Sequence, residues 1–147
     1  MKGFFKCKHP EKYKGNPINI VYRSSYELKA FMQLDHDPNV IKWSSEETIV
    51  PYHCPTDGRL HRYFPDLYVE KKTTHGIKCF LYEIKPADQT LPPVQGKNQK
   101  RFLNEAFTYA KNVAKWNACK KYCEQRGWEF KILTEKELQI PTYETKR

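Results

Sequence analysis

The sequence predicts an α/β (α+β) fold in which helices flank one central mixed β-sheet. Short apolar runs rich in β-branched and aromatic residues, separated by turn residues, occupy most of residues 40–85. A long stretch without proline or glycine follows, and its apolar residues recur at steps of three and four. The chain has 147 residues, which is enough for one domain with a single core.

The two ends of the chain differ from the middle. Residues 1–17 hold five lysines, two glycines and two prolines without apolar periodicity, so we expect an irregular basic N-terminal arm. Such an arm either keeps the protein soluble or contacts phosphates. Residues 18–140 are predicted to form the folded domain, and residues 141–147 a frayed C-terminal tail.

The first helix is expected from about Ser25 to Leu34, after a short β-branched run. The preceding serine pair can cap it, and its apolar residues are Leu28, Phe31 and Met32.

Four strands should follow that helix. The segments VIKWSS and ETIVPYH lead into the turn residues of CPTDGR, and LHRYFPDLYVE and IKCFLYEIK are joined across KKTTHG. The proline-bearing PADQTLPPVQG is expected to be a loop.

A long amphipathic helix is predicted from about Asn98 to Arg126, with Gly127 placed to end it. WEFKIL reads as a closing strand. Thr134 lies three residues before Glu137, the spacing of a capping box, so a final short helix is expected there.

Composition narrows the class of partner. Lysine and arginine total 26 against 17 acidic residues, a net charge of +9, which favours an anionic partner such as nucleic acid. We expect no membrane span and an intracellular protein, because the chain lacks a run of 18 apolar residues and a secretory signal. The five cysteines lack paired spacing, which indicates free thiols. Cys119 and Cys123 lie one helical turn apart and are expected to be buried side chains of a helix, with zinc binding as the weaker alternative.

Charged residues interrupt the apolar strands in one pattern. Glu83 and Lys85 lie two apart and therefore share a strand face, with Cα atoms roughly 6.6 Å apart. Asp66 follows Pro65 in the strand expected beside them, and Glu27 lies on the helix face that Phe31 turns to the core. Buried charges need partners, and oxygen donors suit Mg²⁺ or Mn²⁺. For Glu83 and Lys85 the alternative to a metal site is an exposed edge strand with a surface ion pair between them. For Glu27 the alternative is an ion pair with a lysine or arginine at the edge of its helix face.

These residues resemble the PD-(D/E)xK signature of the restriction-endonuclease-like nucleases: Pro65-Asp66, then Glu83-Ile84-Lys85. Longer segments, among them DGRLHRYFPDLYV, YEIKP and WEFKILTEKEL, resemble the head completion proteins of T-even-type tailed bacteriophages. That family is in turn similar to the TnsA transposon endonuclease.

The resemblance implies a restriction-endonuclease-like core and a divalent-metal-dependent DNA endonuclease that acts on packaged DNA during head completion, before tail joining. It implies double-stranded DNA and phage head, portal or neck proteins as partners. The implied location is the bacterial host cytoplasm during assembly, with the head or neck of the virion as a further location. Glu27, Asp66, Glu83 and Lys85 would be catalytic, and the metal ligands would be Glu27, Asp66, Glu83 and the Ile84 carbonyl.

DNA contacts are expected at two helix starts. Arg23 and Ser24 precede the first helix, and Lys97, Gln99, Lys100 and Arg101 open the long one. The alternative for Ser24 is that it only caps the helix, and the alternative for the second group is a solvated helix start. His53, His61 and His75 read as ordinary polar positions. A structural head or neck protein that binds DNA without turnover remains the competing function, while a transcriptional DNA-binding module has little support.

Overall fold

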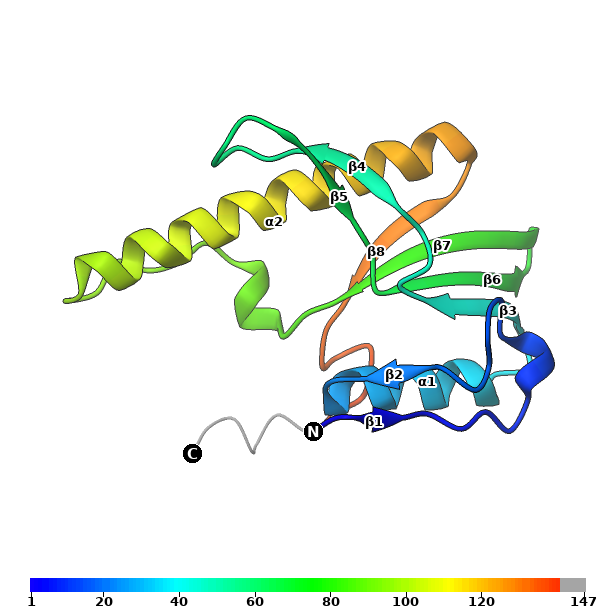
Figure 1. Ribbon diagram of the computed structural model, residues 1–147. Coiled ribbons are helices and arrows are strands. Elements are labelled where there is room, and N and C mark those ends of the chain that lie inside the picture. Colours follow the sequence, from blue (N-terminus) through cyan, green and yellow to red (C-terminus); the bar gives the residue numbers. More distant parts are fainter. Residues whose placement is uncertain (141–147) are drawn as a thin grey trace.

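The computed structural model describes residues 1–140 and contains one four-stranded sheet (Figure 1). Its strand order is β3-β6-β7-β8, formed by Val40–Ser45, Leu67–Thr73, Gly76–Ile84 and Glu129–Leu133. Neighbouring strands run antiparallel except β7 and β8, which are parallel. The predicted mixed sheet flanked by helices is confirmed.

Two small hairpins and two helices complete the fold of residues 1–140. β1 (Gly3–Phe4) pairs with β2 (Val21–Tyr22), and β4 (Val50–His53) pairs with β5 (Leu60–Tyr63). The helices are α1 (Ser25–His36) and α2 (Gln99–Arg126), and two short 3₁₀ turns cover Pro10–Lys12 and Ala87–Thr90.

The helices lie on opposite faces of the sheet. α1 and the β1–β2 hairpin cover one face, whereas α2 and the β4–β5 hairpin cover the other (Figure 1). Along β7, Phe80 packs with the α1 side around Phe31 and Trp43. Its neighbour Leu81 packs with Cys119 on the α2 side. The expected alternation of side chains along this strand is confirmed, and it supplies a core to each face.

The first helix forms where its cap predicts. Ser24 Oγ accepts a hydrogen bond of 3.1 Å from the Glu27 amide, which satisfies one of the free N–H groups of the first turn. Phe31 is buried as expected, but Met32 is 53% exposed. The apolar stripe of α1 is therefore narrower than the sequence suggested, and Met32 lies outside it.

LHRYFPDLYVE is not one strand, as predicted, but two. β5 ends at Tyr63 and β6 begins at Leu67, with the buried Pro65 between them. Proline has no N–H for a sheet ladder, so the chain leaves the α2-side hairpin at this point and enters the central sheet.

The long helix is confirmed at both ends. Asn98 Oδ1 accepts from the Arg101 amide at 3.1 Å, and Gly127 has the left-handed φ of 70° that ends a helix. The residues of α2 that are fully buried, Cys119 and Cys123, belong to its C-terminal half. The N-terminal half projects beyond the sheet (Figure 1).

Residues 1–17 do not form the irregular arm that the sequence suggested, because much of this stretch packs on the domain. Tyr13 is buried, and Phe5 lies against the α1-side core. The Lys12 ammonium donates to the carbonyls of Leu34, Asp35 and Asp37 at the end of α1. One of the five lysines of the predicted arm therefore caps a helix C-terminus.

The predicted final helix is wrong. Glu137 Oε1 accepts from the Thr134 amide at 2.7 Å, as a capping box requires, yet the chain makes only a turn. Gln139 has a φ of 57°, a left-handed conformation that ends a helix after one turn. The expected tail at 141–147 lies outside the described residues. Neither helix in residues 1–140 has both the length and the apolar character needed to cross a bilayer.

Candidate active site

Two carboxylates face one another where β6 begins and β7 ends. Leu67 pairs with Tyr82 in the antiparallel ladder, so Asp66, just before β6, lies opposite Glu83. Asp66 Oδ2 accepts the Ile84 amide at 2.7 Å, which fixes the aspartate against the end of β7. Glu83 is 6% exposed. The hairpin thus brings together the residues that the sequence placed on adjacent strands.

The pair is electrostatically unfavourable without a cation. Burial, reinforced by the neighbouring Glu83 carboxylate, raises the pKa of Asp66 to about 9. The Ile84 amide opposes this change but does not cancel it. Two adjacent carboxyl groups that cannot both ionise easily mark a place where a bound cation would be favourable.

Glu27 is held at the start of α1 by two backbone interactions. Its amide donates to Ser24 Oγ at 3.1 Å, and its Oε1 accepts the Arg23 amide at 2.9 Å. The partner considered for Glu27 alone was a lysine or arginine side chain, but the partner observed is a backbone amide. The cap therefore also fixes the carboxylate.

Glu46 is a member of the site that the sequence analysis missed. One carboxylate oxygen from each of Glu27, Glu46 and Asp66 lies within 4.8 Å of the other two. Glu46 follows β3, and its amide donates to the Asp66 carbonyl at 3.1 Å. Its carboxylate pairs with the Arg23 guanidinium at 3.0 Å. The acids SEE after an apolar strand were a signal, but only the β3–β6 register places Glu46 beside Asp66.

One hollow of about 290 Å³, here called the acidic hollow, is lined by Lys85 and by all four acidic residues, Glu27, Glu46, Asp66 and Glu83. Lys85 comes directly after β7, and its amide donates to the Leu133 carbonyl of β8 at 3.0 Å. The lining residues are Arg23, Ser24, Tyr26, Glu27, Glu46, Asp66, Glu83, Ile84, Lys85 and Pro86. Every residue predicted to be catalytic or metal-binding thus lies on the same hollow, together with Arg23 and Ser24.

A second group of predicted residues lies elsewhere. Lys97 and Arg101 line a separate groove at the start of α2, and Gln99 and Lys100 are exposed in its first turn. Arg101 pairs with Glu105 at 2.9 Å. The acidic hollow is not lined by any of these four residues, so the structure does not bring them together with the predicted catalytic residues.

A buried tyrosine, Tyr63, lies near the Glu83 carboxylate, and the sequence did not predict it there. Tyr63, the last residue of β5, is 6% exposed. Burial, together with the Glu83 carboxylate, raises the pKa of its hydroxyl. Only the β5–β6 break, which turns the chain at Pro65, brings this residue behind Glu83.

The carboxylate pair at the end of a β-hairpin, between two helices, defines a restriction-endonuclease-like domain. The chain belongs to the TnsA-like endonuclease family, whose N-terminal domain matches residues 37–135. The match contains Asp66, Glu83 and Lys85, while Glu27 lies before it.

The chain is also 41% identical over 133 residues to the Head completion nuclease of Enterobacteria phage T4, and the alignment covers 87% of each protein. The resemblances found in the sequence, to T-even head completion proteins and to TnsA, are thus confirmed.

Proposed function

We propose that this protein is a divalent-metal-dependent DNA endonuclease that acts on packaged phage DNA during head completion, before tail joining. The observation that carries the proposal is the convergence of Glu27, Asp66, Glu83 and Lys85 on one hollow. Family membership and the similarity to the Head completion nuclease of phage T4 support it. Phage head, portal or neck proteins are its proposed partners, and the host cytoplasm during assembly its proposed place.

The donor set of the hollow fits a hard cation. The carboxylates of Glu27, Glu46 and Asp66 present oxygens within 4.8 Å of one another, with Glu83 beside Asp66. Asp66, Glu83 and the Ile84 carbonyl would hold Mg²⁺ or Mn²⁺, and Glu27 and Glu46 would complete the shell. When bound, the ion supplies charge neutralisation at the scissile phosphate and favours ionisation of a water molecule.

Lys85 has a separate role. It lines the hollow directly after Glu83, where its ammonium group can orient the attacking water and balance negative charge on the phosphate. The carboxyl groups that line the hollow make it unfavourable for an anion, so Lys85, like Arg23, supplies positive charge that favours the approach of the anionic substrate.

Duplex DNA would be held by basic and polar side chains at two places. Arg23 and Ser24 lie at the hollow itself, near the start of α1, where amide groups favour an anion. Lys97, Gln99, Lys100 and Arg101 lie at the start of α2, whose 28 residues extend for about 42 Å. This second group would therefore contact the DNA backbone some distance from the cleaved bond, and it would contribute to affinity rather than to chemistry.

Plasmid cleavage tests the proposal. We expect the purified protein to convert supercoiled plasmid to nicked or linear DNA in Mg²⁺ or Mn²⁺, and to lose this activity in EDTA. Asp66→Asn and Lys85→Ala should each lower the rate by at least about 100-fold. Asp88→Asn and Lys72→Ala are matched controls, because both residues are exposed and lie outside the hollow.

Two results would contradict the proposal. Cleavage that persists in Asp66→Asn and Lys85→Ala would show that the hydrolytic site lies elsewhere. Tight DNA binding without metal-dependent cleavage would favour the competing function, a structural head or neck protein without turnover.

A further inference from the structure

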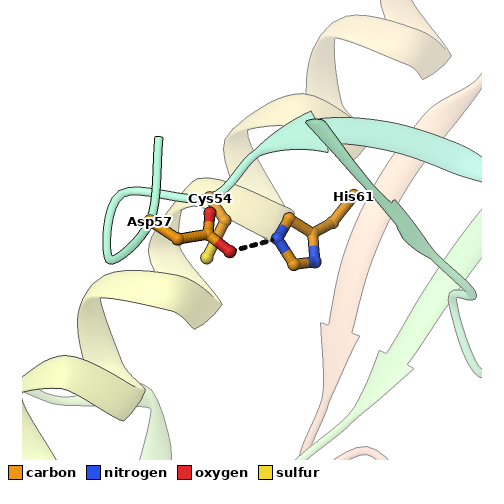
Figure 2. Close-up of side chains that lie close together, drawn as sticks. All are labelled: Cys54, Asp57 and His61. Atoms are coloured by element: carbon orange, nitrogen blue, oxygen red, sulfur yellow. Dashed lines mark hydrogen bonds and ion pairs between the residues drawn. The ribbon is translucent and has the colours of Figure 1, made fainter. Parts of the chain in front are cut away.

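A second cluster of metal-ligating side chains lies on the β4–β5 hairpin. Cys54, Asp57 and His61 each present one donor atom, and these three atoms lie within 4.8 Å of one another. Figure 2 shows the three side chains converging, with Asp57 bonded to the His61 ring. None of the three lines the acidic hollow, so this cluster is distinct from the candidate active site.

The backbone of the hairpin holds the three residues together. The Cys54 amide donates to the Arg59 carbonyl, and the Gly58 amide donates to the Cys54 carbonyl, both at 2.8 Å. Gly58 has a φ of +69°, which favours glycine there. His61 pairs with Tyr52 across the ladder. The turn therefore positions the donors through its own hydrogen bonds.

The donor types select a particular kind of ion. A thiolate, an imidazole and a carboxylate form a ligand set suited to Zn²⁺, whereas Mg²⁺ requires oxygen donors. Tetrahedral zinc with ligands at about 2.0–2.3 Å sets its donor atoms roughly 3.3–3.8 Å apart. Asp57 Oδ2 and His61 Nε2 are now 2.7 Å apart, so a small opening of this pair would admit the ion.

We propose that Cys54, Asp57 and His61 form a zinc site that cross-links the turn of the β4–β5 hairpin, on a hollow that α2 also lines. The proposal is independent of the nuclease function, because it uses neither the acidic hollow nor its residues. An Asp57–His61 ion pair alone would account for two of the residues. The Cys54 sulfur atom, in a residue that is 3% exposed, contacts Thr56 Oγ1 at 3.2 Å and is a third donor within reach of both.

The surroundings leave room for a fourth ligand and balance its charge. The three residues open onto a hollow of about 260 Å³ that Thr108, Lys111 and Asn112 of α2 also line, which is enough space for a water ligand. Thiolate and carboxylate together carry two negative charges, so a divalent ion makes the cluster neutral. Two lysines, Lys111 and Lys115, also line this hollow. The ammonium group of Lys115 lies 5.7 Å from the ring centroid of Tyr63.

Cobalt substitution gives a direct test. Co²⁺ bound by a thiolate has a charge-transfer absorption in the near ultraviolet, so we expect that band to saturate at one equivalent of Co²⁺ and to disappear when Zn²⁺ is added. Excess Mg²⁺ in the buffer occupies oxygen-donor sites and should leave the band unchanged. Cys54→Ser should abolish the band, while Cys79→Ser, the matched control at a half-buried cysteine on β7, should keep it.

A second variant covers the case in which Cys54→Ser disturbs folding. His61→Gln changes a side chain that is 41% exposed, and it should weaken Co²⁺ binding at least tenfold. Zn²⁺ should raise the melting temperature of the wild-type protein but not that of His61→Gln. The proposal is overturned if the wild-type protein shows no band, or if the band survives in Cys54→Ser. It is also overturned if His61→Gln binds Co²⁺ as tightly as the wild-type protein does. Asp66→Asn should keep the band, which separates this result from any failure of the nuclease proposal.

Discussion

At the scale of single residues, the most consequential feature is the carboxyl pair formed by Asp66 and Glu83. Folding places Asp66 where its pKa rises to about 9, mainly through burial and next through Glu83. In the unfolded chain an aspartate titrates near 3.9. Between these two values the folded protein keeps a proton that the unfolded chain releases. The free energy of unfolding therefore falls as the pH rises from about 4 towards 9.

Asp66→Asn should remove that pH dependence in metal-free protein. The asparagine oxygen can still accept the Ile84 amide, so we expect the fold to be retained. The free energy of unfolding of the variant, relative to wild type, should rise by at least about 1 kcal/mol between pH 5 and pH 8.5. Urea denaturation in EDTA at both pH values measures it. A constant difference between the two proteins would show that Asp66 ionises normally in the folded state.

Glu46 gives a second residue-scale prediction. Its φ of 55° is unfavourable for a side chain with a Cβ atom, so Glu46→Gly should maintain or raise stability. It also removes one of three converging carboxylates, and we expect Mn²⁺ affinity to fall about tenfold. Isothermal titration calorimetry measures the affinity, and Glu47→Gly is the matched control at the adjacent exposed acid. Equal affinity in both variants would exclude Glu46 from the metal site.

At the scale of elements, local signals predicted most of the fold. Ser24 and Asn98 cap the two helices, Gly127 ends the second, and alternation along β7 separates its two faces. These features depend on neighbouring residues, so a single sequence reveals them. The 1–17 segment and the β5–β6 break could not be predicted in this way, because contacts with distant residues decide them. Lys12, for example, is fixed by carbonyls more than twenty positions away.

The same distinction explains the site. Asp66, Glu83 and Lys85 belong to one hairpin, and Glu27 to a helix with a visible cap, so their pattern could be read from the chain. Glu46 joins them only through the pairing of β3 with β6. The cluster on the β4–β5 hairpin was missed because His61 was judged alone, without its turn partners.

The two halves of α2 should differ in local stability. Its N-terminal half projects from the domain (Figure 1). In the C-terminal half, Cys119 and Cys123 are buried in the same core cluster as Leu81 of β7. We expect amide hydrogens in residues 102–108 to exchange at least tenfold faster than those in 116–123, because exchange there requires only local opening. Hydrogen exchange followed by mass spectrometry measures this. Equal protection in dilute protein would show that the projecting half is stabilised by contacts absent from the described chain.

At the scale of the whole molecule, the net charge of +9 should govern DNA affinity. Each phosphate contact steepens the dependence of log K on log salt by about 0.9. Lys100→Ala should therefore weaken duplex binding and reduce the slope by about 1. Lys72→Ala, at the opposite end of β6 from Asp66, is the matched control. Fluorescence anisotropy across a salt series measures both, and identical slopes would exclude the start of α2 from the DNA interface.

Anomalous scattering from crystals soaked in Mn²⁺ would test whether the acidic hollow holds the ion needed for hydrolysis. We expect a peak about 2.0–2.6 Å from an Asp66 oxygen and from an oxygen of at least one other carboxylate among Glu27, Glu46 and Glu83. In Asp66→Asn crystals the peak should weaken or vanish. A fully occupied manganese peak elsewhere, with this hollow accessible and empty, would contradict the account.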